Sequence, residues 1–163
     1  MSWLAVEKAK ELHLRYPGLS GPPVDIESMA EAEGLEWLSW PFLHPVKEVK
    51  RGRWVGLAQN LSRPEQRYLL AHALAHHLMH AGNQLSFHHQ QFGMVGREER
   101  EAEVCAAHIL MPGEELTKVI AMSLWDLADY FGVPEELAYH RISDYATQEE
   151  KERWDKVCYD GYV

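Results

Sequence analysis

The stretch between Ser62 and Gly82 constrains the fold more than any other part of the sequence, because it carries signals for both ends of a helix. Ser62 and Glu65 have the spacing of a capping box, and Pro64 suits the first turn of a helix. Gly82 is a typical residue just beyond a helix C-terminus. We therefore expect one long helix that ends at His80 or one residue later.

Two histidines share one face of this helix. His72 and His76 are four residues apart, so at about 100° per residue they differ by about 40°, and both imidazoles can reach a single metal ion. Leu74 and Leu78 lie on the opposite side, facing the expected core. In a chain with ten histidines this spacing alone also fits two surface or capping histidines. A third ligand residue would favour the metal site over the two surface or capping histidines.

The helix expected over 97–111 offers that third ligand. Glu99 and Glu103 lie about 40° apart on one face, beside Ala106 and other small residues that permit close helix approach. We rank Glu99 first and Glu103 second. His108 lies on the opposite side of the helix from Glu99, and we expect it to be exposed to solvent.

The remaining chain supplies further helices and a small sheet. Helical patterns run over 3–16 and over 25–34. Three strand-like runs follow, which we expect to form a small antiparallel sheet: 35–40, 46–49 and 53–60. A polar loop that contains His88 and His89 separates the two helices of the candidate site. After Pro112-Gly113 we expect three shorter helices, which start near Ser123, Pro134 and Thr147.

Composition limits the classes of protein to which the chain can belong. With 163 residues, of which 46% are hydrophobic and 25% charged, the chain is expected to fold around one core. It has no apolar run of about 18 residues and no signal-peptide core, so we expect a cytoplasmic protein that does not enter a membrane. Its two cysteines, Cys105 and Cys158, do not make a disulfide framework.

Charge is distributed unevenly along the chain. Residues 113–163 hold five Lys and Arg against 12 Asp and Glu, so this part should repel the phosphates of nucleic acids. A basic cluster lies upstream and consists of Lys47, Lys50, Arg51, Arg53, Arg63 and Arg67. Arg51 and Arg53 are our candidates for substrate binding. The alternative is a solvated surface without a binding role.

Two longer motifs surround the candidate ligands. One is QRYLLAHALAHHLMH over Gln66–His80, and the other is EREAEVCAAHILMP over Glu99–Pro112. The first resembles the segment R-F-T-L-A-H-E-L-G-H-x-L-L-H of the ImmA/IrrE metallopeptidases, and the second is similar to their segment E-x-x-A-N-x-F-A-x-x-L-L-M-P. Members of this gluzincin-like HExxH family cut helix-turn-helix repressors of mobile elements or stress regulons. Two matches in the same order argue against a chance similarity.

The resemblance implies an α+β fold with two regions. Residues 1–112 would form a zincin-like metallopeptidase domain, in which a small three-stranded sheet packs on helices. Residues 113–163 would form a helical C-terminal region that acts as a helix-turn-helix-like packing or docking module.

The resemblance also implies the metal and its ligands. Zinc would be held by His72, His76 and Glu99, in agreement with the helix geometry, although manganese or iron also suits such ligands. Glu103 stands where the family often has Asn, a position from which it would orient a ligand histidine.

One position departs from the family pattern. The glutamate beside the first histidine of H-E-x-x-H takes a proton from the attacking water and passes it to the leaving amine, and here that position is Ala73. General acid-base assistance is worth about 10²–10⁴-fold in rate, so we expect a catalytically impaired chain. Either the protein has lost catalysis or a glutamate has been replaced. The survival of the three ligands and of the surrounding motif favours a replacement.

The sequence leaves more than one hypothesis for function. The first is a zinc metalloendopeptidase that cleaves a helix-turn-helix transcriptional repressor, with the strand at 53–60 as an edge strand that pairs with the substrate. The second is a non-catalytic metal-binding protein that binds and antagonises a repressor without cutting it. A third is a DNA-binding regulator that uses residues 123–142, including Arg141, but this region is acidic. We therefore expect a protein partner and no direct contact with nucleic acid.

Overall fold

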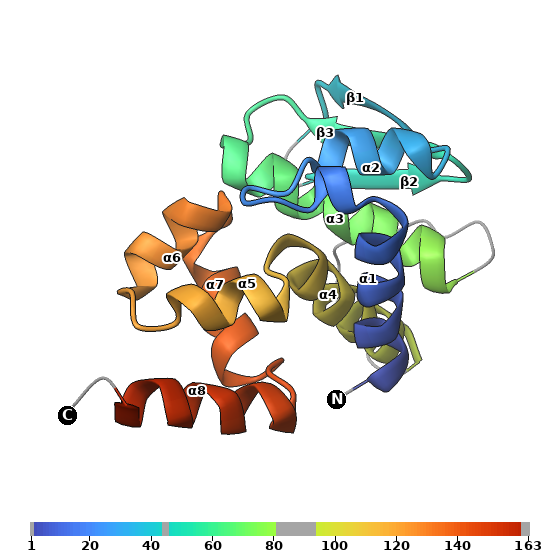
Figure 1. The fold of residues 1–163 in the computed structure, drawn as a ribbon. Helices are drawn as coiled ribbons and strands as arrows, with labels where there is room; N and C mark the ends of the chain where they lie inside the picture. Colours follow the sequence, from blue (N-terminus) through green and yellow to red (C-terminus); the bar gives the residue numbers. More distant parts are fainter. Residues whose placement is uncertain (1, 44–45, 81–93, 161–163) are drawn as a thin grey trace.

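The computed structural model describes residues 2–43, 46–80 and 94–160, and its fold is α+β, as the resemblance implies (Figure 1). His88 and His89 lie outside the described residues. The elements are α1 (Trp3–Arg15), a 3₁₀ helix η1 (Pro17–Leu19), α2 (Ile26–Ala32), β1 (Glu36–Trp40), β2 (Glu48–Arg51), β3 (Trp54–Ala58), α3 (Arg63–Met79), α4 (Met94–Leu110), α5 (Gly113–Val119), α6 (Leu124–Phe131), α7 (Glu135–Ser143) and α8 (Gln148–Asp160). The helices α3 and α4 pack against each other between the sheet and the group α5–α8.

The helix expected around the two histidines is α3. Ser62 is its N-cap and forms the predicted capping box with Glu65: the Glu65 N–H donates to Ser62 Oγ (3.4 Å), and the Ser62 N–H donates to the Glu65 carboxylate (2.9 Å). His80 is the C-cap. Every residue from Leu69 to His76 is buried, because α1, α2, β3 and α4 all pack against this helix. The two histidines therefore lie inside the protein.

The sheet is mixed, whereas we expected an antiparallel one. Its strand order is β1-β3-β2, with β2 antiparallel and β1 parallel to β3. A tight turn containing Gly52 (φ 59°) joins β2 to β3, so the other side of β3 is left for β1. The prediction that the 53–60 run forms an edge strand is wrong, because β3 is the central strand. Among the described residues, the edges of the sheet are β1 and β2.

The described helices include one that the sequence did not predict. We expected three helices after Pro112-Gly113, and the structure has four, because α5 begins directly at Gly113. The same Pro112 that ends α4 is the N-cap of α5, and Glu114 and Glu115 lie in its first turn, where acidic side chains are favourable. None of the described helices is long and apolar enough to cross a membrane.

Buried polar contacts join residues 113–163 to the rest of the protein. Arg67 of α3 donates from Nε to the carbonyl of Gly132 (3.0 Å), and Arg141 of α7 donates from Nε to the carbonyl of Met111 (3.1 Å). Arg141 is completely buried. It is therefore not available to contact DNA, the role that the third hypothesis gave it. The division of the chain at residue 112 stays a prediction.

Candidate metal centre

Three side chains from α3 and α4 converge inside the protein. Nε2 of His72 lies 3.3 Å from Oε2 of Glu99, and Nε2 of His76 lies 3.2 Å from Oε1 of the same carboxylate. The two imidazole rings are nearly perpendicular, with their centroids 4.7 Å apart. Both histidines are buried, whereas the side chain of Glu99 keeps 28% of its surface exposed. The structure thus brings together both histidines and the carboxylate that the sequence ranked first.

The donor atoms of these residues suit one metal ion. One ligand atom from each of the three lies within 4.8 Å of the other two. Zinc binds nitrogen and oxygen ligands at about 2.0–2.2 Å in a tetrahedron, so the ligand atoms around it lie roughly 3.3 Å apart. The two distances from Nε2 to Glu99 agree with this spacing. Two imidazoles and one carboxylate fit zinc, and manganese or iron can use the same donors.

The charges at the centre are strongly coupled. Burial alone would lower the pKa of His72, but the carboxylates of Glu48 and Glu99 outweigh it and raise that pKa to about 10. Burial alone would raise the pKa of Glu99, yet hydrogen bonds from His72 and His76 hold it well below its usual range. A metal ion must displace a proton from His72 to bind its nitrogen. Metal binding is therefore expected to release protons.

Sequence reasoning missed Glu48, which reaches the centre from the sheet. Its Oε2 lies 3.0 Å from Nδ1 of His72, and both side chains are buried. Glu48 is on β2, where it pairs in register with the buried Leu57, so its side chain points to the core side of the sheet. The only sequence signal was a charged residue at an inward position of a short strand.

Ala73 lies beside His72 in α3 and is completely buried. Its methyl group cannot accept a proton. Among the described residues, the group that could hold a metal contains one carboxylate, that of Glu99. Glu48 contacts His72 through Nδ1, on the side of the ring away from the Nε2 that faces Glu99. Glu48 therefore does not take the place of the missing glutamate.

Glu103 lies one turn beyond Glu99 on α4 and faces the C-terminal region. The hydroxyl of Tyr145 donates to its carboxylate (3.1 Å). Both residues line a cavity of about 580 Å³, together with Lys47, Glu65, Tyr68, Leu69, Pro134, Glu136, Leu137 and His140. The carboxylate of Glu103 thus contacts Tyr145. The role of Glu103 in orienting a ligand histidine stays a prediction.

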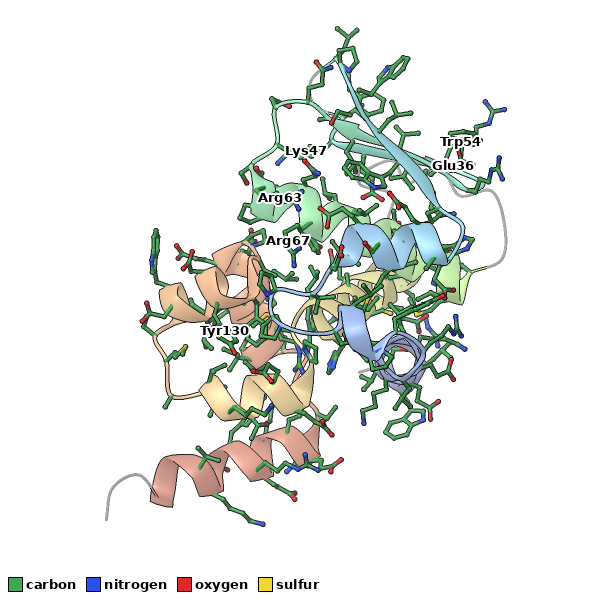
Figure 2. The ribbon with its side chains drawn as sticks, turned by 45° about the horizontal axis from the view of Figure 1, so that its top comes forward. Glu36, Lys47, Trp54, Arg63, Arg67 and Tyr130 are labelled. Carbon is green, nitrogen blue, oxygen red and sulfur yellow. The ribbon has the colours of Figure 1, made fainter. Side chains whose placement is uncertain are left out.

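Arg51 and Arg53 lie at the turn between β2 and β3. Nη2 of Arg53 is 3.0 Å from Oε1 of Glu36, and its guanidinium carbon is 5.4 Å from the centre of the Trp54 ring. Arg51 is exposed and pairs in register with Trp54. Figure 2 shows Glu36 and Trp54 at one end of the sheet and Lys47 at the other. The two arginines are thus accessible, and their role in substrate binding stays a prediction.

His108 is buried, so the prediction that it is solvated is wrong. Its exposed fraction is 5%, and its Nε2 donates to the carbonyl of Tyr145 (2.8 Å). The side of α4 opposite Glu99 also faces protein, because α4 packs against α1, α3 and α7. Burial lowers the pKa of His108 to about 4, so the ring is neutral near pH 7.

Comparison with solved structures supports the fold. The chain is similar to a Mycobacterium tuberculosis transcriptional regulator, with a TM-score of 0.62 and 18% sequence identity, over 88% of this chain and 49% of that chain. It thus spans about half the length of the regulator. None of the curated proteins matches the chain.

Comparison with family models covers the region of the candidate metal centre. The model of the IrrE N-terminal-like domain, Peptidase_M78, matches residues 41–143. This range contains β2, β3, α3 and α4, and with them the three converging side chains and Ala73. Because the match covers more than half of the chain, the protein belongs to the metallopeptidase-like family of IrrE N-terminal-like domains.

Proposed function

We propose that the protein is a zinc metalloendopeptidase scaffold that acts on a helix-turn-helix transcriptional repressor. The observation that carries this proposal is the convergence of His72, His76 and Glu99 inside a domain of a metallopeptidase-like family. The fold shared with a transcriptional regulator is in keeping with a partner in transcriptional control.

In this proposal His72, His76 and Glu99 hold the metal ion. When bound, the metal supplies a Lewis acid that polarises the scissile carbonyl. The two histidines come from one helix and are buried on every side, so their rings are held in place before the metal arrives. Glu99 is the partly exposed member of the group, and the substrate would reach the centre from its side.

Ala73 separates metal binding from catalysis. A methyl group at this position leaves the three ligands intact but supplies no acceptor for the proton of the attacking water. The loss of general acid-base assistance costs about 10²–10⁴-fold in rate. We therefore propose that the chain binds metal and substrate but cleaves slowly at best.

The edge strand β2 is our candidate for pairing with an extended substrate. Among the described residues β2 pairs only with β3, so its second edge can accept another strand. The strand also lies next to the candidate metal centre, because its residue Glu48 contacts His72. The cavity that Tyr68 and Glu103 line begins one helical turn from the ligands, and it would receive a side chain of the substrate.

The test is to restore the glutamate and measure cleavage. Ala73→Glu, loaded with zinc, should cut a candidate helix-turn-helix repressor, with a rate at least 10²-fold above that of the unaltered protein. Ala73→Gln is the matched control, because it has the same size but cannot take the proton. Cleavage of the repressor by both variants, or equal cleavage of the repressor and of an unrelated protein by Ala73→Glu, would contradict a specific repressor peptidase.

A second candidate function is a binder that antagonises the repressor without cutting it. Ala73 itself favours this alternative, because the chain has the ligands without the base. In that case Ala73→Glu binds zinc and the repressor but leaves the repressor intact. The cleavage assay, combined with measurements of zinc binding and repressor binding by Ala73→Glu, therefore distinguishes the two functions.

A further inference from the structure

The imidazole of His72 lies between two carboxylates. Its Nδ1 is 3.0 Å from Glu48 Oε2, and its Nε2 is 3.3 Å from Glu99 Oε2. A neutral imidazole has one N–H and one lone pair, and a metal requires the lone pair. When Nδ1 donates its hydrogen to Glu48, the lone pair is left on Nε2, the nitrogen that faces Glu99.

We propose that Glu48 is a positioning residue of the candidate metal centre: it accepts the Nδ1–H of His72, fixes the orientation and tautomer of the ring, and leaves Nε2 ready for the metal. This inference rests on the proposed metal-binding role of His72, His76 and Glu99. A carboxylate in this position also makes the histidine a better donor to the metal.

The burial of Glu48 supports a specific role. Its side chain has no exposed surface, and it occupies a strand position opposite Leu57 where an apolar residue would pack. Among the described residues, its one hydrogen bond is to His72, and its Oε1 has no hydrogen-bond partner. Burying a carboxylate is unfavourable unless it is paired. Packing alone therefore does not account for a glutamate at this position.

The two ligand histidines differ in this respect. Nδ1 of His76 is buried and has no hydrogen-bond partner among the described residues, so in this part of the chain no carboxylate holds that nitrogen as Glu48 holds Nδ1 of His72. Glu103, which the sequence suggested for a role of this kind, accepts a hydrogen bond from Tyr145. The inference therefore predicts that a change at Glu48 acts through His72 and not through His76.

Glu48 also links the metal centre to the sheet. It is the first residue of the edge strand β2, where we propose that the substrate pairs. The hydrogen bond to His72 spans 24 positions of the sequence. It is the connection between the proposed substrate strand and a metal ligand.

The test measures zinc affinity by competition with a chromophoric chelator. Glu48→Gln keeps the size of the side chain and one acceptor oxygen but removes the charge, and Glu48→Leu removes the acceptor altogether. We expect a loss of about 10–100-fold in zinc affinity for Glu48→Gln and a larger loss for Glu48→Leu. Glu101→Gln is the matched control, because it removes a carboxylate of α4 that pairs with Arg97 and is not part of the candidate metal centre, and it should change the affinity less than about twofold.

A double-mutant cycle separates positioning from general damage. In a His72→Ala background, the remaining zinc affinity should be the same with Glu48 and with Gln at position 48, because the ring on which Glu48 acts is gone. An equal loss in both backgrounds would show that Glu48 supports the fold and does not position His72. Equal zinc affinities of Glu48→Gln and the unaltered protein would also overturn the inference.

Nitrogen NMR of the unaltered protein gives a readout that does not depend on the variants folding. With ¹⁵N-labelled histidine and bound zinc, His72 should show a protonated Nδ1 and a metal-bound Nε2. A metal-bound Nδ1 would overturn the role of Glu48 while leaving the metal centre in place. If the unaltered protein binds no zinc at all, the proposed function fails, and the inference fails with it.

Discussion

Arg141 is completely buried in α7, and its guanidinium pairs with the carboxylate of Glu150 at the start of α8, with Nη1 3.1 Å from Oε2. The same guanidinium donates from Nε to the carbonyl of Met111, just beyond the end of α4. Glu150 also accepts the backbone N–H of Thr147 (2.8 Å). One buried cation thus joins the end of α4 to two helices of the C-terminal region.

Removing Glu150 should destabilise the protein strongly. Glu150→Ala leaves the buried charge of Arg141 without its partner, and breaking a buried pair in this way costs about 3–5 kcal/mol. The free energy of unfolding, measured by urea denaturation, should fall by about that amount. The double variant Arg141→Met with Glu150→Leu should lose less, because no buried charge is left unpaired. A larger loss in the double variant would contradict this explanation.

Zinc binding should depend on His72 and Glu99 and not on His108. His72→Ala or Glu99→Ala removes a proposed ligand, so zinc affinity should fall strongly in an equilibrium titration. His108→Ala removes a buried ring on the opposite side of α4, so it should lower stability but leave the zinc affinity near that of the unaltered protein. An equal loss of affinity for His108→Ala and Glu99→Ala would show that the ligands are assigned to the wrong face of α4.

His108 should make the protein sensitive to mild acid. Its pKa is lowered from 6.5 to about 4, so the unfolded chain takes up a proton at this residue before the folded chain does. The stability contributed by the neutral ring is complete above about pH 6.5, and about 3 kcal/mol of it is lost as the pH falls through 4. The free energy of unfolding of the metal-free protein should therefore decrease across this range. His108→Gln should show a shallower decrease, and identical pH profiles would contradict the prediction.

Arg51 and Arg53 should speed the encounter with an acidic partner. Replacing both with Glu should slow association with the repressor several-fold at low salt, and the difference should shrink as the screening length falls towards about 8 Å at physiological ionic strength. Of the two single variants, Arg51→Glu should slow association more than Arg53→Glu does, because Arg53 is already paired with Glu36. The measurement is surface plasmon resonance at several salt concentrations. Equal association rates at every concentration would identify these arginines as a solvated surface.

Much of the candidate metal centre could be predicted from local signals. The capping box at Ser62 fixed the start of α3, and the four-residue spacing of His72 and His76 fixed their shared face. The same spacing rule selected Glu99 on α4, and the structure places it 3.2–3.3 Å from both imidazoles. Which residues share a face depends on the geometry within each helix, which the sequence encodes directly.

The features that could not be predicted depend on packing between distant segments. Contact between Glu48 and His72 requires β2 to lie across α3, and no local pattern indicates that placement. His108 was assigned to solvent because it lies opposite Glu99, but a helix packed against three others has no solvent face at that position. The parallel pairing of β1 with β3 likewise depends on how the hairpin at Gly52 inserts into the sheet.

Arg67 shows how the two halves of the protein are connected mechanically. It lies five residues before His72, about 7.5 Å along the axis of α3, and it donates to the carbonyls of Gly132 (3.0 Å) and Phe131 (3.4 Å). The helix that presents the candidate ligands therefore also supports the turn between α6 and α7, and Figure 2 shows Arg67 next to the helices of the C-terminal region. A rotation of that turn must break these two hydrogen bonds or move α3 with it. The position of the turn is therefore coupled to the position of His72 and His76.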